Sequence, residues 1–262
     1  MDTDDARWCV TGAAGTIGQA LRAHLAGRGI RLRSLDIIDA EPVSATDEVM
    51  RVDVRDLEAL TAAFEGVTGV LHLGGLADEA DFQDLAEVNI VGTYHVLEAA
   101  RRAGAARVVF ASSNRLTGAY PASVVVDPTM PPRPDGFYGV SKVAGEALCQ
   151  LYADTFGLST VSIRIGSYEE RPTSARESHT WLSHADAMRA FDAAMATDAH
   201  TAVFYAVSRN TDRWWDLEAG ERIGYTPEDD AAAFGDLGRM PTGSMQGGVY
   251  ASAEYSLERM RR

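Results

Sequence analysis

Short apolar runs alternate with amphipathic stretches through the first two thirds of the chain. Buried strands are predicted by six runs, at residues 7–10, 30–36, 49–53, 69–73, 107–111 and 160–165. Amphipathic helices are predicted between them, at residues 16–27, 56–65, 82–103 and 138–156. Strands that alternate with helices favour an α/β fold built on a doubly wound parallel sheet. Ligands of such sheets bind at the carboxyl ends of the strands.

Two long stretches lack this periodicity. Residues 112–137 contain five prolines, and residues 166–180 are similarly irregular. Loops of this length inside a compact domain are usually functional or disordered. Beyond them the pattern predicts a helix over residues 185–197, a strand over 202–206 and a basic helix over 256–262.

Composition excludes several classes of partner. The formal net charge of −14 disfavours binding to nucleic-acid phosphate or to anionic lipid, so we expect neither nucleic acid nor membrane as a partner. No apolar run is long enough to span a bilayer. Cys9 and Cys149 lie in apolar and helical patterns, which suits buried free thiols. Together with an acidic start unlike a signal peptide, this predicts a cytoplasmic protein.

A glycine-rich turn joins the first predicted strand to the first helix. Gly12, Gly15 and Gly18 have the spacing and the strand-to-helix context of a dinucleotide-binding turn, in which glycine allows the pyrophosphate to approach the helix N-terminus. Asp36 ends the second strand, where a carboxylate accepts hydrogen bonds from both ribose hydroxyls and repels a 2′-phosphate. NAD is therefore favoured over NADP as cofactor. Arg33 could argue for NADP, but its alternation with apolar neighbours favours a solvated charge at the sheet edge.

These observations predict a Rossmann-type domain over residues 1–165 and a small substrate-binding portion over residues 166–262, closely packed as one domain. The cofactor is expected at the glycine turn, at the strand ends and at the catalytic pair described next. The predicted cofactor contacts are Gly12, Gly15, Thr16, Ile17, Gly18, Asp36, Asp53, Val54, Leu73, Gly74, Ala111, Tyr138, Lys142 and Ile165.

Tyr138 and Lys142 are four residues apart on a predicted helix and so share one face. A nearby ammonium is expected to lower the pKa of the tyrosine, whose phenolate can then take a proton from a substrate hydroxyl. Ser113, at the end of the fifth strand, is expected to orient that hydroxyl, and is preferred to Ser112 because neighbouring strand residues point to opposite faces. Asn89 is a poor residue for a helix interior, which suggests a specific role such as holding water in a proton relay.

Longer motifs, spread over nearly the whole chain, resemble those of a known family. They are the segments at residues 72–75, 111–114, 133–142, 164–167, 180–184, 214–216 and 246–248. With them the chain resembles the uronate dehydrogenases, within the extended short-chain dehydrogenase/reductase superfamily. The Pro-Asp-Gly-Phe-Tyr and Trp-Trp-Asp stretches are the most specific of these motifs.

The resemblance implies an enzyme that uses NAD to oxidise the C1 (anomeric) hydroxyl of a hexuronate, such as galacturonate or glucuronate, to the aldarolactone. By this resemblance Ser113, Tyr138 and Lys142 are the catalytic triad, and Asn114 bonds sugar hydroxyls. Ser167 and Arg176 are expected to hold the substrate carboxylate, with Arg171 as a rival cation for that role.

Two positions depart from the pattern of these enzymes. Ala77 stands where they have a serine, and Arg115 stands where they have a histidine. The first removes a hydroxyl from the substrate site. The second adds a cation to the predicted substrate contacts. Arg115 would meet a second anionic group such as a phosphate, or it would point to solvent or support the loop. Both leave the reaction class intact and bear on the choice of sugar.

Three alternatives remain open. A related aldose or sugar-phosphate 1-dehydrogenase would share the chemistry, and a nucleotide-sugar epimerase or dehydratase would share the cofactor. A redox-sensing NAD-binding regulator would lack turnover, against which the intact catalytic group argues.

No cluster of cysteine, histidine and carboxylate predicts a metal site. The superfamily resemblance suggests a homo-oligomer that pairs through its long helices.

Overall fold

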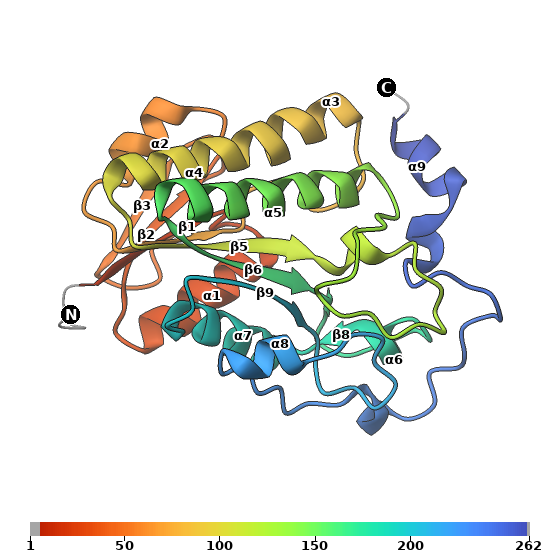
Figure 1. Ribbon diagram of the computed structural model, residues 1–262. Coiled ribbons are helices and arrows are strands. Elements are labelled where there is room, and N and C mark those ends of the chain that lie inside the picture. The colour runs from red at the N-terminus through yellow and green to blue at the C-terminus, as the bar shows by residue number, and fades with distance from the viewer. Residues whose placement is uncertain (1–5, 261–262) are drawn as a thin grey trace.

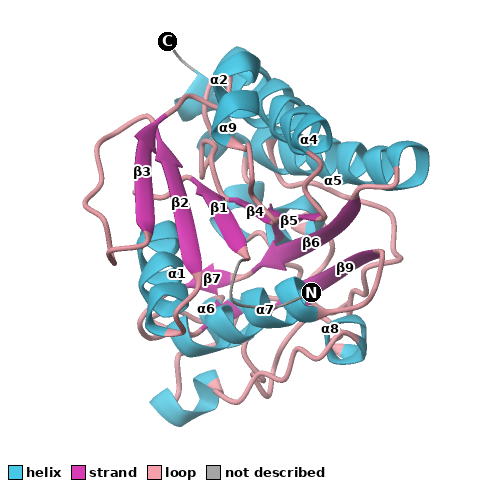
Figure 2. Cartoon of the chain, turned by 90° about the vertical axis from the view of Figure 1, so that its left-hand side faces the viewer, coloured by secondary structure: helices cyan, strands magenta, loops and turns pink. Residues whose placement is uncertain are grey.

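The computed structural model describes residues 6–260 and has one parallel sheet at its centre. Its strands lie in the order β3-β2-β1-β4-β5-β6-β9 (Figure 2). They are β1 (Arg7–Thr11), β2 (Arg31–Asp36), β3 (Asp47–Arg51), β4 (Gly69–His72), β5 (Arg107–Ser113), β6 (Ser159–Ile165) and β9 (Thr201–Ala206). This confirms the predicted doubly wound α/β fold.

Helices cover both faces of the sheet (Figure 1). One face carries α1 (Thr16–Gly27) and α7 (His184–Ala196), and the other carries α2 (Leu57–Ala63), α4 (Gly92–Ala103) and α5 (Phe137–Phe156). Short elements lie beyond the carboxyl ends of the strands or in the connections. These are α3 (Phe82–Leu85), η2 (Ala86–Val91), η3 (Asn114–Thr117), β7 (Ser167–Tyr168), α6 (Glu177–Thr180), β8 (Trp181–Leu182), α8 (Glu218–Arg222), η4 (Ala231–Phe234), η5 (Gly248–Ala251) and α9 (Ala253–Met260).

Two apolar cores form because successive strand residues point to opposite faces of the sheet. Val10 packs with Leu21 and Phe191 on the side of α1 and α7. Its neighbour Cys9 packs on the other face with Leu97 and other residues of α2, α4 and α5. The cysteines are fully buried and free, as predicted.

The predicted third strand, at residues 49–53, was placed two residues too late. The strand begins at Asp47, a charged residue that the apolar pattern could not include. The Asp47 carboxylate is buried because it accepts hydrogen bonds from the Arg22 guanidinium at 2.7 Å and from the Ser34 hydroxyl at 2.6 Å. The strand ends at Arg51, so Asp53 lies in the connection that follows it.

The single long helix predicted over residues 82–103 is continuous but contains a π-helical turn, η2, between α3 and α4. Asn89 lies in this turn and is buried. The predicted basic helix at residues 256–262 begins earlier, as α9 at Ala253, and residues 261 and 262 lie outside the described part of the chain.

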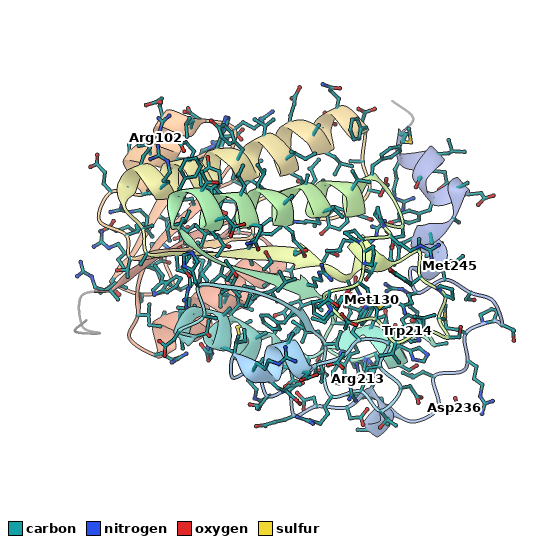
Figure 3. The ribbon with its side chains drawn as sticks, in the orientation of Figure 1. Arg102, Met130, Arg213, Trp214, Asp236 and Met245 are labelled. Atoms are coloured by element: carbon teal, nitrogen blue, oxygen red, sulfur yellow. The ribbon has the colours of Figure 1, made fainter. Side chains whose placement is uncertain are left out.

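The two irregular stretches lie at the carboxyl ends of the strands, where they meet the end of the chain. The amide of Ala122 donates to the backbone carbonyl of Ser244, and Val126 and Trp215 form a parallel bridge. In Figure 3 Met130, Trp214 and Met245 accordingly lie on one side of the molecule, far from Arg102 at the opposite end of α4. The chain after residue 165 also supplies β9 and α7, so it completes the central sheet as well as the region beyond it.

Candidate active site

A cavity of about 850 Å³ opens at the carboxyl ends of the strands. It brings together every residue predicted from the sequence to bind cofactor or substrate or to act in catalysis, except Asn89 and the rival cation Arg171. These residues are Gly12, Gly15, Thr16, Ile17, Gly18, Asp36, Asp53, Val54, Leu73, Gly74, Ala111, Ser113, Asn114, Arg115, Tyr138, Lys142, Ile165, Ser167 and Arg176.

The glycine turn is closed too tightly for side chains. Gly12 has φ +70°, and a Cβ on it would lie 2.7 Å from the backbone nitrogen of Gly74. A Cβ on Gly18 would lie 2.1 Å from the carbonyl oxygen of Gly12. Gly15 precedes α1 without a side-chain cap, so the first amides of that helix face the cavity with donors available for a pyrophosphate.

Asp36 joins the end of β2 to the glycine turn. Its Oδ2 accepts a hydrogen bond from the Ala14 amide at 2.9 Å, and its Oδ1 accepts from the amides of Ile37 and Ile38. Arg33 donates instead to Glu48 and to the carbonyls of Ala63 and Glu65. The prediction of a solvated Arg33 was therefore wrong, and these bonds direct the cation away from a 2′-phosphate.

Asp53 lies in the connection after β3 and lines the cavity, as predicted. The Arg55 guanidinium donates to both carboxylate oxygens of Asp53, and this hydrogen bonding lowers the pKa of Asp53. Val54 fills the space beside Gly74 and Gly92, where a Cβ would lie within 3 Å of its methyl groups. The walls of the cavity are thus close-packed around the glycines.

Ser113, Tyr138 and Lys142 meet where β5 ends and α5 begins. The Lys142 Nζ donates to the carbonyl of Ala111 at 2.9 Å and lies 5.6 Å from the centre of the Tyr138 ring. Ser113 and Tyr138 line the same cavity, and the Ser113 hydroxyl lowers the pKa of the Tyr138 phenol. Ser112 points elsewhere and donates to Glu146 at 2.6 Å, which agrees with the choice of Ser113.

Burial is the largest influence on the pKa values of Tyr138 and Lys142. It raises the pKa of Tyr138 to about 12, while the Ser113 hydrogen bond and the charge of Arg115 act in the opposite direction. Burial also lowers the pKa of Lys142 to about 8. The expected lowering of the tyrosine pKa is therefore outweighed by burial in this structure, and Arg115 is a cation that acts against that rise.

Asn89 lies behind the cavity. Its Oδ1 accepts from the amide of Leu76 at 2.8 Å, and its Nδ2 donates to the carbonyl of Leu76 and to the Ser141 hydroxyl, each at 3.0 Å. The side chain therefore connects the loop after β4 to the catalytic helix. The relay role predicted for Asn89 stays a prediction.

His72 is buried between two hydroxyls as part of a chain of hydrogen bonds. The Thr93 hydroxyl donates to the carbonyl of Asn89 and so accepts from the His72 Nε2 at 3.0 Å. The Nδ1 then accepts from Thr11, at 2.8 Å. Burial lowers the pKa of His72 to about 3, so the ring stays neutral and structural.

Arg115 is buried and paired with acidic side chains. Its guanidinium donates to Asp135 at 2.9 Å and to Asp78 at 2.6 Å, and Glu79 lies 3.3 Å away. It also lies over the ring of Tyr138, 5.2 Å from its centre. The side chain lines the cavity as predicted, but three carboxylates outnumber its charge, which favours support of the loop over binding of a phosphate.

Arg176 has a different environment. Its Nε donates to the carbonyl of Gln246, and its Nη1 donates to the Ser167 hydroxyl at 3.2 Å. Among the described residues no carboxylate lies within ion-pair distance of it, and burial lowers its pKa. Deeper in the cavity, the Asn114 Nδ2 is buried without a hydrogen-bond partner in the described part of the chain. Both groups keep donors for a ligand.

The sequence analysis missed residues that shape the site, among them Tyr250 and Glu79. Tyr250 lines the cavity between two cations, 4.6 Å from Arg115 and 5.0 Å from Arg176. Glu79 is buried and accepts from the amides of Phe137 and Tyr138. An aromatic residue after the Gly-Gly pair at 247–248 was a weak signal for Tyr250, whereas a lone glutamate in a loop gave none for Glu79.

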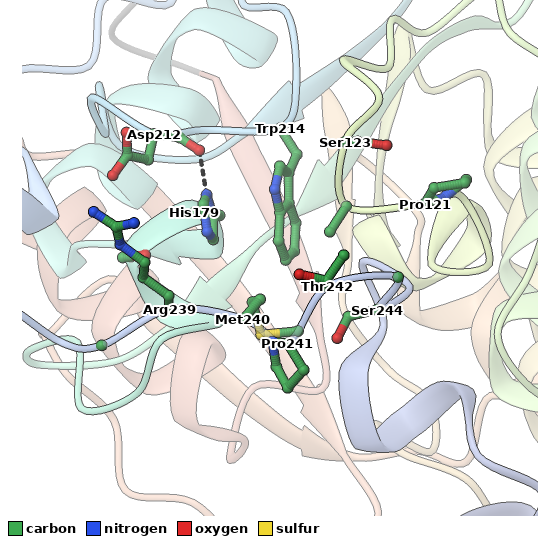
Figure 4. A pocket seen from close by; sticks show the side chains of 14 residues that line it. Pro121, Ser123, His179, Asp212, Trp214, Arg239, Met240, Pro241, Thr242 and Ser244 are labelled. Carbon is green, nitrogen blue, oxygen red and sulfur yellow. Dashed lines mark hydrogen bonds between the residues drawn. The ribbon is translucent and has the colours of Figure 1, made fainter.

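A second cavity, of about 500 Å³, lies beside α6 and contains none of the predicted site residues (Figure 4). His179 stacks on Trp214 in its wall with ring centres 4.2 Å apart.

Within residues 6–260 no group of histidine, cysteine and carboxylate side chains is arranged to hold a metal ion. Nor does any helix in that range have the length and apolarity needed to cross a membrane.

The fold and the cavity fit a Rossmann-type, NAD-dependent oxidoreductase. The family model described as "NAD dependent epimerase/dehydratase family" matches residues 8–169, and the chain belongs to this family.

Three relatives show the range of similarity. Uronate dehydrogenase of Pseudomonas syringae pv. tomato is 41% identical over 87% of this chain and 84% of its own. L-arabinose 1-dehydrogenase (NAD(P)(+)) of Haloferax volcanii is 38% identical over 87% of this chain and 98% of its own. The crystal structure of glucuronic acid dehydrogenase from Chromohalobacter salexigens is 36% identical, with a TM-score of 0.90 over 97% of this chain and 99% of that chain. The predicted resemblance is confirmed.

The geometry of the glycine turn gives a testable prediction. Gly12→Ala places a methyl group against the Gly74 backbone, and we expect NADH affinity to fall about tenfold or more, which corresponds to about 1.4 kcal/mol. Fluorescence titration with NADH measures it. Gly29→Ala is the matched control, because Gly29 also has a positive φ, +75°, but has nothing within 4 Å of the added Cβ. Equal affinity in both variants would contradict the placement of the cofactor.

Proposed function

We propose that the protein oxidises the C1 hydroxyl of a hexuronate, such as galacturonate or glucuronate, to the aldarolactone, with formation of NADH. The relatives named as uronate and glucuronic acid dehydrogenases support the substrate class. The observation that carries the proposal is Arg176, a half-buried cation without a carboxylate partner among the described residues, in the same cavity as Tyr138.

The catalytic group accounts for the proton. Tyr138, as phenolate, takes the proton of the C1 hydroxyl, and Ser113 holds the oxygen of that hydroxyl by a hydrogen bond. Lys142 is fixed by the Ala111 carbonyl close to the phenol and to the cofactor side of the cavity. NAD, when bound, supplies the hydride acceptor. A base with a raised pKa requires turnover to increase as the pH rises.

The substrate is held from its other end. An arginine pairs with a carboxylate through two parallel hydrogen bonds, and Arg176 keeps N–H groups for this purpose beside the Ser167 hydroxyl. Asn114 supplies an unused amide donor for a sugar hydroxyl. In this arrangement residues 166–262 provide the carboxylate contacts and residues 1–165 provide the cofactor and proton contacts.

A related aldose 1-dehydrogenase is the second candidate. The Haloferax volcanii relative named for L-arabinose supports it, as does Ala77, which lines the cavity without a hydroxyl. A phosphorylated sugar is less well supported, because the guanidinium of Arg115 already meets Asp78, Glu79 and Asp135. An epimerase would recycle NAD and would not accumulate NADH.

Activity on a panel of sugars tests the reaction. We expect galacturonate or glucuronate to reduce NAD, followed at 340 nm, at least ten times faster than neutral aldoses. Tyr138→Phe should lower kcat by about 10²–10⁴-fold, because general base catalysis is lost, and should leave NADH binding intact. Tyr152→Phe is the control on the same helix, since its hydroxyl bonds Glu98 away from the cavity. Full NADH production by Tyr138→Phe would exclude the mechanism.

The carboxylate contact has its own test. Arg176→Gln should raise the KM for galacturonate about 100-fold, because loss of one partner of a buried charge pair costs about 2–5 kcal/mol. The KM for a neutral aldose should change little. Arg171→Gln, the rival cation, is exposed and serves as the control. A large effect of Arg171→Gln with none of Arg176→Gln would reverse the assignment.

We further propose that two copies pair through α4 and α5, which lie side by side on one face (Figure 1). Exposed apolar side chains on these helices support it, namely Tyr94, Val140, Leu151 and Phe156. Leu151→Glu should then reduce the mass measured by light scattering. Leu257→Glu is the control, because Leu257 is equally exposed, at 51%, but lies on α9. A monomeric wild-type protein would sink this proposal.

A further inference from the structure

The catalytic helix begins without a cap from its own sequence. Gly136 precedes α5 in an extended conformation and has no side chain to accept from the first free amides. Four such amides at a helix start require partners from elsewhere. In α5 the second residue is Tyr138, so whatever binds these amides also fixes the backbone of the proposed base.

Glu79 provides the missing acceptors from a distant loop. Its Oε1 accepts from the Phe137 amide at 2.7 Å, and its Oε2 accepts from the Tyr138 amide at 3.2 Å. The carboxylate is fully buried, and its charge is balanced by Arg115 at 3.3 Å. A negative charge at a helix N-terminus is also favoured by the helix dipole.

Space for this contact depends on Gly136. A Cβ at that position would lie 2.4 Å from the Glu79 Oε2. With a φ of −172° the backbone of Gly136 is extended, a conformation open to any residue. The glycine is therefore required by the carboxylate and not by the turn.

The loop that carries Glu79 also forms part of the cavity wall. Gly74, Leu76 and Asp78 line the cavity, and Asn89 holds Leu76 by two hydrogen bonds. The wall of the cofactor site and the first turn of the catalytic helix are thus joined by the Glu79 side chain.

We propose that Glu79 is a positioning residue for the dehydrogenase reaction, which sets the direction of the Tyr138 phenol toward Ser113 by holding the first two amides of α5. This inference rests on the proposed function for its kinetic consequence. Glu79 does not reach the reacting atoms in this role, so its loss should affect the rate and not the binding of either ligand.

Three variants test the proposal in the full-length protein. Glu79→Gln puts an amide donor against one of the two backbone donors, and Gly136→Ala displaces the carboxylate while keeping its charge. Both should lower kcat at least tenfold and leave the KM values for NAD and galacturonate within twofold of wild type. Asp81→Asn is the control, because Asp81 caps α3 from the same loop without contact to α5. If Glu79→Gln folds and keeps kcat within twofold of wild type, the proposal is overturned.

Hydrogen exchange separates this proposal from the function. Mass spectrometry of the peptide over residues 137–142 should show faster amide exchange in Glu79→Gln than in Asp81→Asn. This readout needs no turnover. If the wild-type protein reduces no NAD but exchange is faster in Glu79→Gln than in Asp81→Asn, the contact is supported and the dehydrogenase function is refuted. Equal exchange in both variants would refute the contact itself. Gly136→Ala repeats the measurement if Glu79→Gln does not fold.

Discussion

The meeting of the end of β5 with the first turn of α5 is the constraint on which the site depends. Ser113 and Tyr138 come from opposite sides of an irregular segment, and neither element alone sets their separation. The Lys142 ammonium, bound to the Ala111 carbonyl, fixes the side of α5 against the strand. Glu79 holds the N-terminal end of this helix. Together these contacts restrict both the rotation and the translation of the helix. Proton transfer over hydrogen-bond distance requires such a fixed geometry.

Buried polar bonds behind the site stiffen this junction. Glu146 accepts from the Ser112 hydroxyl and from the Arg164 guanidinium, and Arg164 donates in turn to the Tyr205 hydroxyl. Tyr205 and Thr117 are bonded at 2.9 Å. Satisfied polar networks in a low dielectric specify one arrangement of their members. This network connects β5, α5, β6 and β9. The last strand of the sheet therefore helps to fix the end of β5, where Ser113 lies.

The fold and most of the cavity were predictable because their signals are local. The glycine turn, Asp36 and the tyrosine-lysine pair each lie within one element or one turn, and strand ends in a parallel sheet meet at a common edge. Contacts between distant segments carry no such signal. The pairing of Arg115 with carboxylates from two loops and the burial of Asp47 at the start of β3 depend on packing that periodicity does not encode. The same limit hid the part played by Glu79 and Tyr250.

Asp36 has a structural role besides the ribose contact predicted for it, since its carboxylate accepts hydrogen bonds from the amides of Ala14, Ile37 and Ile38. Re-engineering coenzyme preference toward a phosphorylated dinucleotide therefore involves more than removing a negative charge. A replacement side chain would have to supply acceptors for three backbone donors while a new cation is introduced nearby. Serine or asparagine at this position retains some of that capacity, whereas alanine removes all the side-chain bonds and leaves the backbone bond from the Ala13 amide to the Leu35 carbonyl to join the turn to the strand end.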